Sequence, residues 1–179
     1  MIVVTTSRRT TQRIRSFVKD LVSILPSSVK INRGHKSLLE LAIEACKLGA
    51  KYFLVVTEWR GNPRAINIYE VEKTQPHHVE YKEIATILIR GVKLSRENPE
   101  SSRAYGISRI GVDYSKCISD DCFYLADLLV KILQDKISEK PELKIVLEED
   151  KFIVIKALNI HEKPVGPVLR VEKVVRHGD

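Results

Sequence analysis

The chain has no apolar run that approaches the roughly 20 residues needed to cross a bilayer. Its first residues turn polar and basic after three apolar positions, which is too short for the apolar core of a signal peptide. We therefore expect an intracellular, cytoplasmic protein. Cysteine is also scarce, because only Cys46, Cys117 and Cys122 occur, and their odd number and spacing fit neither a disulfide framework nor a CxxC metal site. We expect buried thiols.

Motifs for catalysis and for cofactor binding are missing too. The sequence has no GxxxxGK(S/T) loop and no GxGxxG after a strand, and it shows no nucleophile with a base and no cluster of metal ligands. His77 and His78 are adjacent and their side chains diverge, so a surface loop is simpler than a metal site. Asp120 or Asp121 is expected to cap a helix, and residues 148–150 to form a hairpin turn. We predict a non-enzymatic protein without cofactor or metal.

The positive charge is concentrated in one part of the chain. Lys and Arg number 30 against 23 Asp and Glu, a net charge of +7. Residues 1–36 hold eight basic residues and one acidic residue, which leaves 22 of each sign for residues 37–179. This asymmetry predicts a surface that binds a polyanion, either nucleic acid or an anionic membrane, with a solvated basic surface as the alternative.

Strand and helix patterns alternate along the chain. Ile2–Thr5 is β-rich, and apolar residues from Ile14 to Leu25 recur on one helix face, which ends at Pro26. Because a folded domain needs that apolar face for its core, binding of this helix to a membrane is the weaker interpretation. A second helix is predicted after Ser37, where Ser and Glu three residues apart form a capping box, and a third over 123–133. Further strands are predicted over 29–31, 52–56, 65–71, 81–94, 110–113, 143–147, 152–158 and 168–175.

Both halves of the chain run from an extended segment through a helix to further strands. We therefore predict an α/β fold made of a duplicated α/β unit, with mixed sheets and packed helices. The loop-like segment 95–109 is the candidate boundary. A single domain over 1–179 would then have an N-terminal half over 1–94, with the basic helix, and a C-terminal half over 95–179.

The basic segment over 5–13 places hydroxyl groups and arginines at the start of the first predicted helix. Free N–H groups and the positive end of the dipole favour a phosphate there, and arginine donates in a planar fork that suits RNA. On a helical projection Arg8, Arg15 and Lys19 lie opposite the apolar stripe. These features point to an RNA backbone as the ligand.

Basic residues in predicted loops could extend the same surface. The candidate RNA-binding residues are Arg8, Arg9, Arg13, Arg15, Lys19, Arg33, Lys36 and Arg60. Trp59, next to Arg60, could stack on a base, although a core or edge aromatic is the simpler interpretation.

Several of these residues belong to a string of motifs that resembles the Brix domain. The motifs are Thr5-Thr6-Ser7-Arg8, Arg13, Phe17-Val18-Lys19-Asp20-Leu21, Leu25-Pro26, Asn32-Arg33-Gly34, Leu38 to Leu41, residues 55–63, Val165-Gly166-Pro167 and Gly178. The chain is most similar to archaeal Imp4-like members, which carry the domain alone. The resemblance implies a ribosome biogenesis factor that binds precursor ribosomal RNA, and a fold similar to the anticodon-binding domain of class II aminoacyl-tRNA synthetases. Carried over by position, Arg8, Arg13 and Arg33 would contact RNA.

The basic surface and the resemblance together predict a non-enzymatic, RNA-binding ribosome biogenesis factor that acts in the processing or assembly of precursor ribosomal RNA, with the small subunit as the expected particle. The expected partners are precursor ribosomal RNA or a guide RNA, together with other ribosome assembly proteins, and no membrane. Two alternatives stay open: an RNA-processing nuclease, and a protein-interaction module within a ribonucleoprotein particle.

Overall fold

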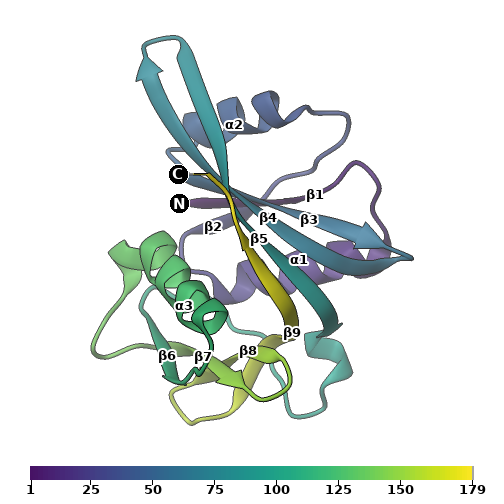
Figure 1. Ribbon diagram of the computed structural model, residues 1–179, viewed down its shortest axis with the longest axis vertical. Helices are drawn as coiled ribbons and strands as arrows, with labels where there is room; N and C mark the ends of the chain where they lie inside the picture. Colours follow the sequence, from purple (N-terminus) through teal and green to yellow (C-terminus); the bar gives the residue numbers. More distant parts are fainter. Residues whose placement is uncertain (179) are drawn as a thin grey trace.

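The computed structural model describes residues 1–178 and contains one mixed sheet with three α-helices beside it (Figure 1). The strands are β1 (Ile2–Thr6), β2 (Ser28–Lys30), β3 (Tyr52–Trp59), β4 (Asn62–Gln75), β5 (His78–Lys93), β6 (Ile110–Lys116), β7 (Leu143–Glu149), β8 (Ile153–Asn159) and β9 (Pro164–Arg176). The helices are α1 (Gln12–Ile24), α2 (Leu38–Lys47) and α3 (Asp120–Leu133), with short 3-10 turns η1 (Ser95–Glu97) and η2 (Gln134–Lys136).

The nine strands of the described residues follow the order β2-β1-β3-β4-β5-β9-β8-β7-β6. At one end β1 is parallel to β2 and β3, and at the other β6 is parallel to β7. The remaining neighbours are antiparallel, including the β5–β9 pair that joins the two sets. The same connectivity therefore occurs twice, once in β1, β3, β4 and β5 and once in β6, β7, β8 and β9. The two sets meet at the β5–β9 pair, and their order across the sheet is reversed. The predicted α/β class with a mixed sheet and packed helices is confirmed, and the division at residues 94 and 95 stays a prediction.

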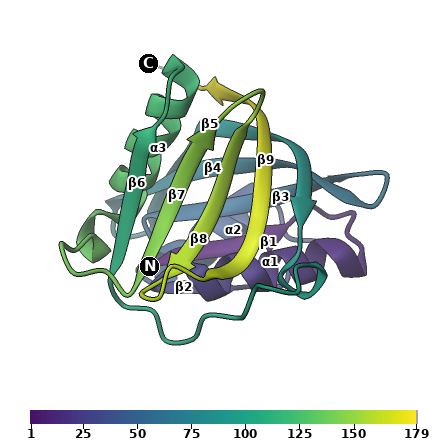
Figure 2. The same ribbon diagram turned by 90° about the horizontal axis from the view of Figure 1, so that it is seen from below.

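The sheet is strongly twisted and buries apolar side chains on both faces. Figure 2 shows β6–β9 running at a steep angle to the first strands, as the accumulated right-handed twist of a large sheet requires. Apolar residues of α1 and α3 join one core cluster, whereas α2 covers a second cluster on the opposite face. Strand β1 contributes Ile2 and Val4 to the first cluster and Val3 to the second. Its continuous apolar run is explained by this burial on both faces.

Helix α1 begins later than the basic segment suggests. Thr11 is its N-cap and accepts a hydrogen bond from the backbone N–H of Ile14 at 3.3 Å. Arg8 and Arg9 therefore lie in the loop before the helix, and the helical projection of Arg8 is wrong. The helix ends at Ile24, just before the expected stop at Pro26.

The two other helices are also fixed by their caps. In α2, Ser37 and Glu40 form the predicted capping box, with reciprocal bonds of 3.2 and 2.7 Å. In α3 the N-cap is Ser119, which accepts from the N–H of Cys122, so the expectation that Asp120 or Asp121 caps the helix is wrong. A hydroxyl one residue earlier takes that place, and both aspartates lie in the first turn.

The cysteine prediction is also corrected. Within residues 1–178, Cys117 and Cys122 form a disulfide, and Cys46 is the one free cysteine. The chain folds back after β6 onto the first turn of α3, which brings the two Cα atoms to 5.4 Å, the usual separation for this bond. A spacing of five residues across a loop and a helix start belongs to no sequence motif for a disulfide.

His77 and His78 are exposed at the β4–β5 turn, as expected for a surface loop. Among the described helices, none has the length and apolar character to span a membrane.

Candidate nucleic-acid interface

The loop over 7–11, between β1 and α1, is held in place by bonds to β3 and to the β3–β4 turn. The N–H of Ser7 donates to the carbonyl of Val56 at 2.8 Å, and the hydroxyl of Ser7 donates to the carbonyl of Arg9 at 2.6 Å. The hydroxyl of Thr11 donates to the carbonyl of Gly61 at 3.0 Å. The basic loop and the β3–β4 turn therefore form one fixed surface.

On one side of this loop lies a hollow of about 210 Å³, which we call the N-terminal pocket. Its lining residues are Thr6, Ser7, Arg8, Thr10, Arg15, Lys30, Ile31, Asn32, Arg33 and Gly34. None of these residues is acidic, so the cations in the lining are not neutralised from within it. This composition suits an anion rather than a cation or a neutral ligand.

Burial, and after it the neighbouring positive charges, lowers the pKa of two cations in the pocket. Burial, followed by the charges of Lys19 and Arg15, lowers the pKa of Lys30. Burial and the neighbouring charge of Arg8 lower the pKa of Arg33. A bound anion would relieve the repulsion, so these groups favour a phosphate in the pocket.

Two of the pocket arginines are held by backbone carbonyls. Arg33 donates from Nε to the carbonyl of Lys36 at 2.7 Å and from Nη1 to the carbonyl of Thr6 at 3.3 Å. Arg8 reaches the carbonyl of His35 at 3.4 Å. Since these bonds use only part of each guanidinium, the remaining N–H groups can donate to a ligand.

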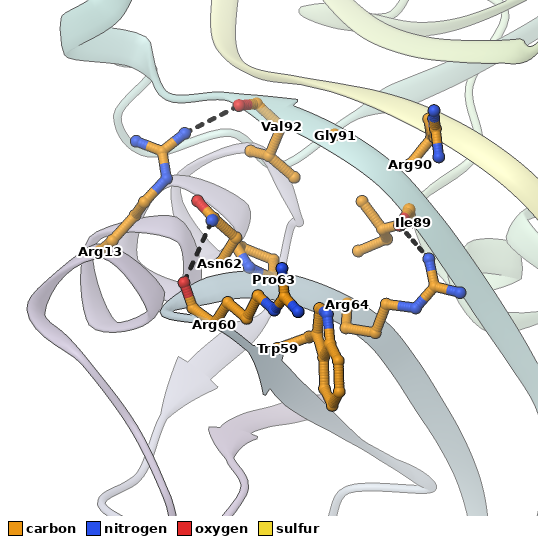
Figure 3. A pocket seen from close by; sticks show the side chains of 10 residues that line it. All are labelled: Arg13, Trp59, Arg60, Asn62, Pro63, Arg64, Ile89, Arg90, Gly91 and Val92. Atoms are coloured by element: carbon orange, nitrogen blue, oxygen red, sulfur yellow. Dashed lines mark hydrogen bonds between the residues drawn. The ribbon is translucent and has the colours of Figure 1, made fainter.

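On the other side of the loop lies a larger hollow of about 780 Å³, which we call the arginine groove (Figure 3). Its lining residues are Arg13, Trp59, Arg60, Asn62, Pro63, Arg64, Ile89, Arg90, Gly91 and Val92. The groove exists because two strands diverge. The β4–β5 ladder ends at the Ala65–Leu88 pair, and from Ile89 onward β5 continues alongside β9 only. The start of β4 and the end of β5 thus become the two walls.

Two of the four groove arginines are tied to carboxylates and to β5. Arg13 forms an ion pair with Glu97 and donates to the carbonyl of Val92 at 2.9 Å. The hydrogen bond from Arg13 lowers the pKa of Glu97. Arg64 donates to Glu172 at 2.9 Å and to the carbonyl of Ile89 at 3.2 Å. Arg64 therefore bridges the two walls, and Arg13 ties α1 to the β5 wall.

The other two groove arginines, Arg60 and Arg90, have no carboxylate partner in the described part of the chain. Within residues 1–178, neither Arg60 nor Arg90 forms an ion pair, and both are exposed. Among the residues that the structure describes, no acidic side chain lines the groove. Arg60 and Arg90 therefore give the groove its uncompensated positive charge.

Trp59 is the aromatic member of the groove lining and is 62% exposed. It is the last residue of β3, and its exposure shows that the interpretation as a core aromatic is wrong. The pairing of β3 with β1 ends at Val56, so Trp59 lies at a local strand edge with β4 as its neighbour, as the other interpretation expects. The Arg60 guanidinium lies 5.6 Å from the centre of its ring, within the range of a cation–π contact.

The structure places five of the eight candidate residues in the linings of the two hollows. Arg8, Arg15 and Arg33 line the N-terminal pocket, Arg13 and Arg60 line the arginine groove, and Arg9 and Lys19 are exposed outside both linings. Lys36 pairs with Glu44 at 3.4 Å and donates to the carbonyl of Asn32, so it is the least available of the eight.

Sequence reasoning missed Lys30, Arg64 and Arg90. Lys30 contributes to the charge of the N-terminal segment, but its place in a short predicted strand gives no sign that it lines a binding site. Arg90 carries a signal that could have been used: it interrupts an apolar strand and precedes Gly91, and a glycine within a strand often marks an irregularity. The ladder indeed shifts register beside Arg90.

Relatives of this chain share one description. A probable Brix domain-containing ribosomal biogenesis protein from Aeropyrum pernix is 48% identical over 94 residues, which cover 52% of this chain and 49% of that protein. A protein with the same description from Saccharolobus solfataricus is 35% identical over 130 residues, which cover 72% of this chain and 69% of that protein. The chain spans about half the length, or less, of several curated relatives that it matches, such as 41% of the Pyrococcus horikoshii protein. No family model matches the chain.

Two solved structures share the fold. The crystal structure of a probable ribosomal biogenesis protein from Aeropyrum pernix K1 superposes with a TM-score of 0.79 at 36% identity and covers 96% of this chain and 95% of that one. That of an archaeal Imp4-like protein gives a TM-score of 0.69 at 22% identity, covering 99% and 100% of the two chains. The second likeness concerns the fold alone.

Proposed function

Because this chain belongs to the Brix domain family of archaeal ribosome biogenesis proteins, we propose that it acts by binding precursor ribosomal RNA as a non-enzymatic assembly factor. In this role it holds or anneals structured RNA during processing or assembly. RNA of the small-subunit precursor is the first ligand to test, since the motifs resemble Imp4-like proteins. A guide RNA and other assembly proteins are further proposed partners.

The observation that carries the proposal is the uncompensated positive charge around the loop over 7–11. Arg8, Arg15 and Lys30 line the N-terminal pocket, which has no acidic lining residue among residues 1–178, and Arg9 and Lys19 are exposed nearby. Protein–RNA affinity depends strongly on phosphate neutralisation. A single domain over residues 1–179 that presents this surface fits an RNA-binding role.

The test compares two variants with equal loss of charge. The first changes four N-terminal residues to alanine: Arg8, Arg9, Arg15 and Lys19. The control changes four exposed lysines from elsewhere to alanine: Lys47, Lys51, Lys140 and Lys163. None of these eight side chains forms an ion pair within residues 1–178, so net charge falls equally and no internal pair is broken. Arg13 is left intact because its pair with Glu97 is structural.

Binding of a small-subunit precursor RNA is measured for each protein at several salt concentrations. Each lost contact to a single-stranded phosphate lowers the log–log salt slope by about 0.7, so four contacts flatten the slope by about 3. We expect this flattening only in the N-terminal variant. Equal behaviour of both variants would refute the placement of the RNA site.

The same experiment separates the two alternatives. Cleavage of the bound RNA that requires a divalent metal, and that stops when acidic residues are changed, would identify a nuclease. Background RNA affinity for the wild type, together with tight binding to a purified assembly protein, would identify a protein-interaction module. Either result would overturn the proposed function.

A further inference from the structure

The β3–β4 turn places an arginine where the backbone favours another residue. Trp59 and Asn62 pair across a two-residue loop, Arg60-Gly61, in which both residues have positive φ (50° and 81°). Such loops favour Asn-Gly or Gly-Gly, because a side chain other than Asn or Asp is strained in the left-handed region. The chain thus keeps Arg60 at a conformational cost. Strain of this kind clusters at ligand sites, where the side chain has a role other than stability.

That side chain lies beside the exposed ring of Trp59. The indole is 62% exposed and lines a hollow, so its large apolar surface faces solvent rather than the core. In Figure 3 the ring lies beside the side chains of Arg60 and Arg64, which line the same groove. A flat, accessible aromatic surface next to guanidinium groups is the arrangement on which proteins stack unpaired bases.

The polar groups of the groove match the rest of a nucleotide. Arg60 and Arg90 carry uncompensated charge for phosphate oxygens, and the Asn62 side chain is exposed and offers a donor and an acceptor to a base edge. Within residues 1–178, the one hydrogen bond of the Asn62 side-chain amide is a long one of 3.4 Å to the carbonyl of Arg60. Arg13 and Arg64 already donate to carboxylates and backbone carbonyls, so their role is to fix the shape of the groove rather than to bind the ligand.

The shape of the groove selects among forms of RNA. Its volume of about 780 Å³ lies within the usual range of small-molecule sites, which is about 300–1,000 Å³. A base in an A-form duplex is stacked and paired, and it cannot present its face to an indole that lines a concave site. An unpaired base in a loop or bulge can do so.

We propose that the arginine groove binds one unpaired nucleotide of single-stranded RNA, with its base stacked on Trp59, its edge facing Asn62, and its flanking phosphates at Arg60 and Arg90. This inference rests on the proposed function, since it assumes that the ligand is RNA. It adds the kind of RNA that is recognised, and it assigns residues outside the N-terminal basic loop.

The chain offers a direct probe, because Trp59 is its only tryptophan. A stacked base quenches indole fluorescence, so emission reports on this site alone. We would titrate the full chain with a short oligouridylate and with a blunt RNA duplex of equal phosphate number, following Trp59 emission and, in parallel, the anisotropy of labelled RNA. We expect the single strand to quench the emission at least two-fold and the duplex to leave it nearly unchanged.

Substitutions then test how much Trp59, Arg60 and Arg90 each contribute to RNA affinity. Loss of stacking in Trp59→Ala should weaken oligouridylate binding by between about 5- and 150-fold, with Trp59→Phe keeping most of the affinity. The matched control is Phe123→Ala, which removes an exposed aromatic side chain from α3 and should bind like the wild type. Each of Arg60→Gln and Arg90→Gln should reduce the salt slope by about 0.7. Circular dichroism establishes that each variant is folded.

The outcomes distinguish this inference from the proposed function. If the wild type binds RNA by anisotropy, while Trp59 emission stays constant and Trp59→Ala binds equally well, the groove is no nucleotide site and the proposed function stands. If the duplex quenches Trp59 as strongly as the single strand, the preference for an unpaired base is wrong. If neither RNA binds at any salt concentration, the proposed function fails together with this inference.

Discussion

Substitution of Gly166 by alanine should destabilise the protein strongly, because two independent penalties meet at this residue. Gly166 is buried near the start of β9 and has a φ of +70°, a conformation that costs an L-residue about 1–2 kcal/mol. An added Cβ would lie 2.5 Å from Cγ2 of Ile24, a contact that no packed structure tolerates without a shift. Ile24 is only 4% exposed, so overpacking adds about 1–3 kcal/mol.

The two penalties together predict a loss of about 2–5 kcal/mol of unfolding free energy. For a chain of this size each kcal/mol lowers the Tm by about 2–4 °C, so the Tm should fall by between about 4 and 20 °C. Thermal and urea unfolding, followed by circular dichroism, measure the effect. The matched control is Gly91→Ala, because Gly91 has no heavy atom within 4 Å of an added Cβ and does not have positive φ.

We expect the control to change the stability by less than about 1 kcal/mol. A Tm for Gly166→Ala within 2 °C of the wild type would refute the steric argument. An equal loss in both variants would show that glycine replacement itself, rather than contact with Ile24, is responsible. In the double variant Ile24→Ala/Gly166→Ala, the alanine Cβ gains room, so the combined loss should be smaller than the sum of the single losses.

Three further predictions concern other parts of the fold. Asp20→Ala should lower the free energy of unfolding by about 1–3 kcal/mol, because Asp20 is buried and accepts a hydrogen bond from the N–H of Ser95 at 2.8 Å. The substitution would leave this N–H unpaired. An unchanged urea midpoint would contradict the prediction. The pKa of Glu142 is lowered from 4.5 to about 2, and the main cause is the hydrogen bond that its carboxylate accepts from the N–H of Ser108. A depressed pKa stabilises the fold above about pH 4.5 and the stabilisation is lost as the pH falls towards 2, so Glu142→Gln should flatten the pH dependence of Tm over this window. Titration of the denatured chain without reductant should find one reactive thiol, that of Cys46, and a count of three would contradict the disulfide.

Local sequence signals predicted the helices and most strands well because the determining contacts are close in the chain. The apolar spacing from Ile14 onward set the buried face of α1, and the Ser37–Glu40 pair set the start of α2. The start of α1 was placed too early because arginines are compatible with both a helix and a loop. The hydroxyl of Thr11 decides between them by capping the helix.

The joining of the strands into one sheet was not accessible from the same signals. The β5–β9 ladder pairs Ala85 with Arg176 and Lys93 with Val168, residues that are far apart in the chain. No periodicity encodes such a pairing. It depends on how both sets of strands bury their faces together, which is a property of the complete core.

The candidate site shows the same division between local and distant determinants. The charge count over residues 1–36 correctly indicated a basic surface, and the N-terminal pocket is built largely from that segment. Arg64 and Arg90 were missed because the arginine groove requires β4 and β5 to separate after the Ala65–Leu88 pair. A strand sequence shows which residues alternate, but the point where two strands part depends on the register of the whole sheet.

The two hollows offer different interactions, and this difference is measurable as a contrast in salt dependence. The N-terminal pocket presents cations and hydroxyl groups, so its proposed contribution to RNA affinity is electrostatic and should decrease steeply with salt. Trp59 presents an apolar surface, and the stacking of a base on it involves no released counterion. Trp59→Ala should therefore lower the affinity by the same factor at every salt concentration, whereas loss of Arg8, Arg9, Arg15 and Lys19 should change the slope. If Trp59→Ala also flattened the slope by several units, the groove and the pocket would not act as separate sites, because one substitution without charge would have displaced phosphates from both.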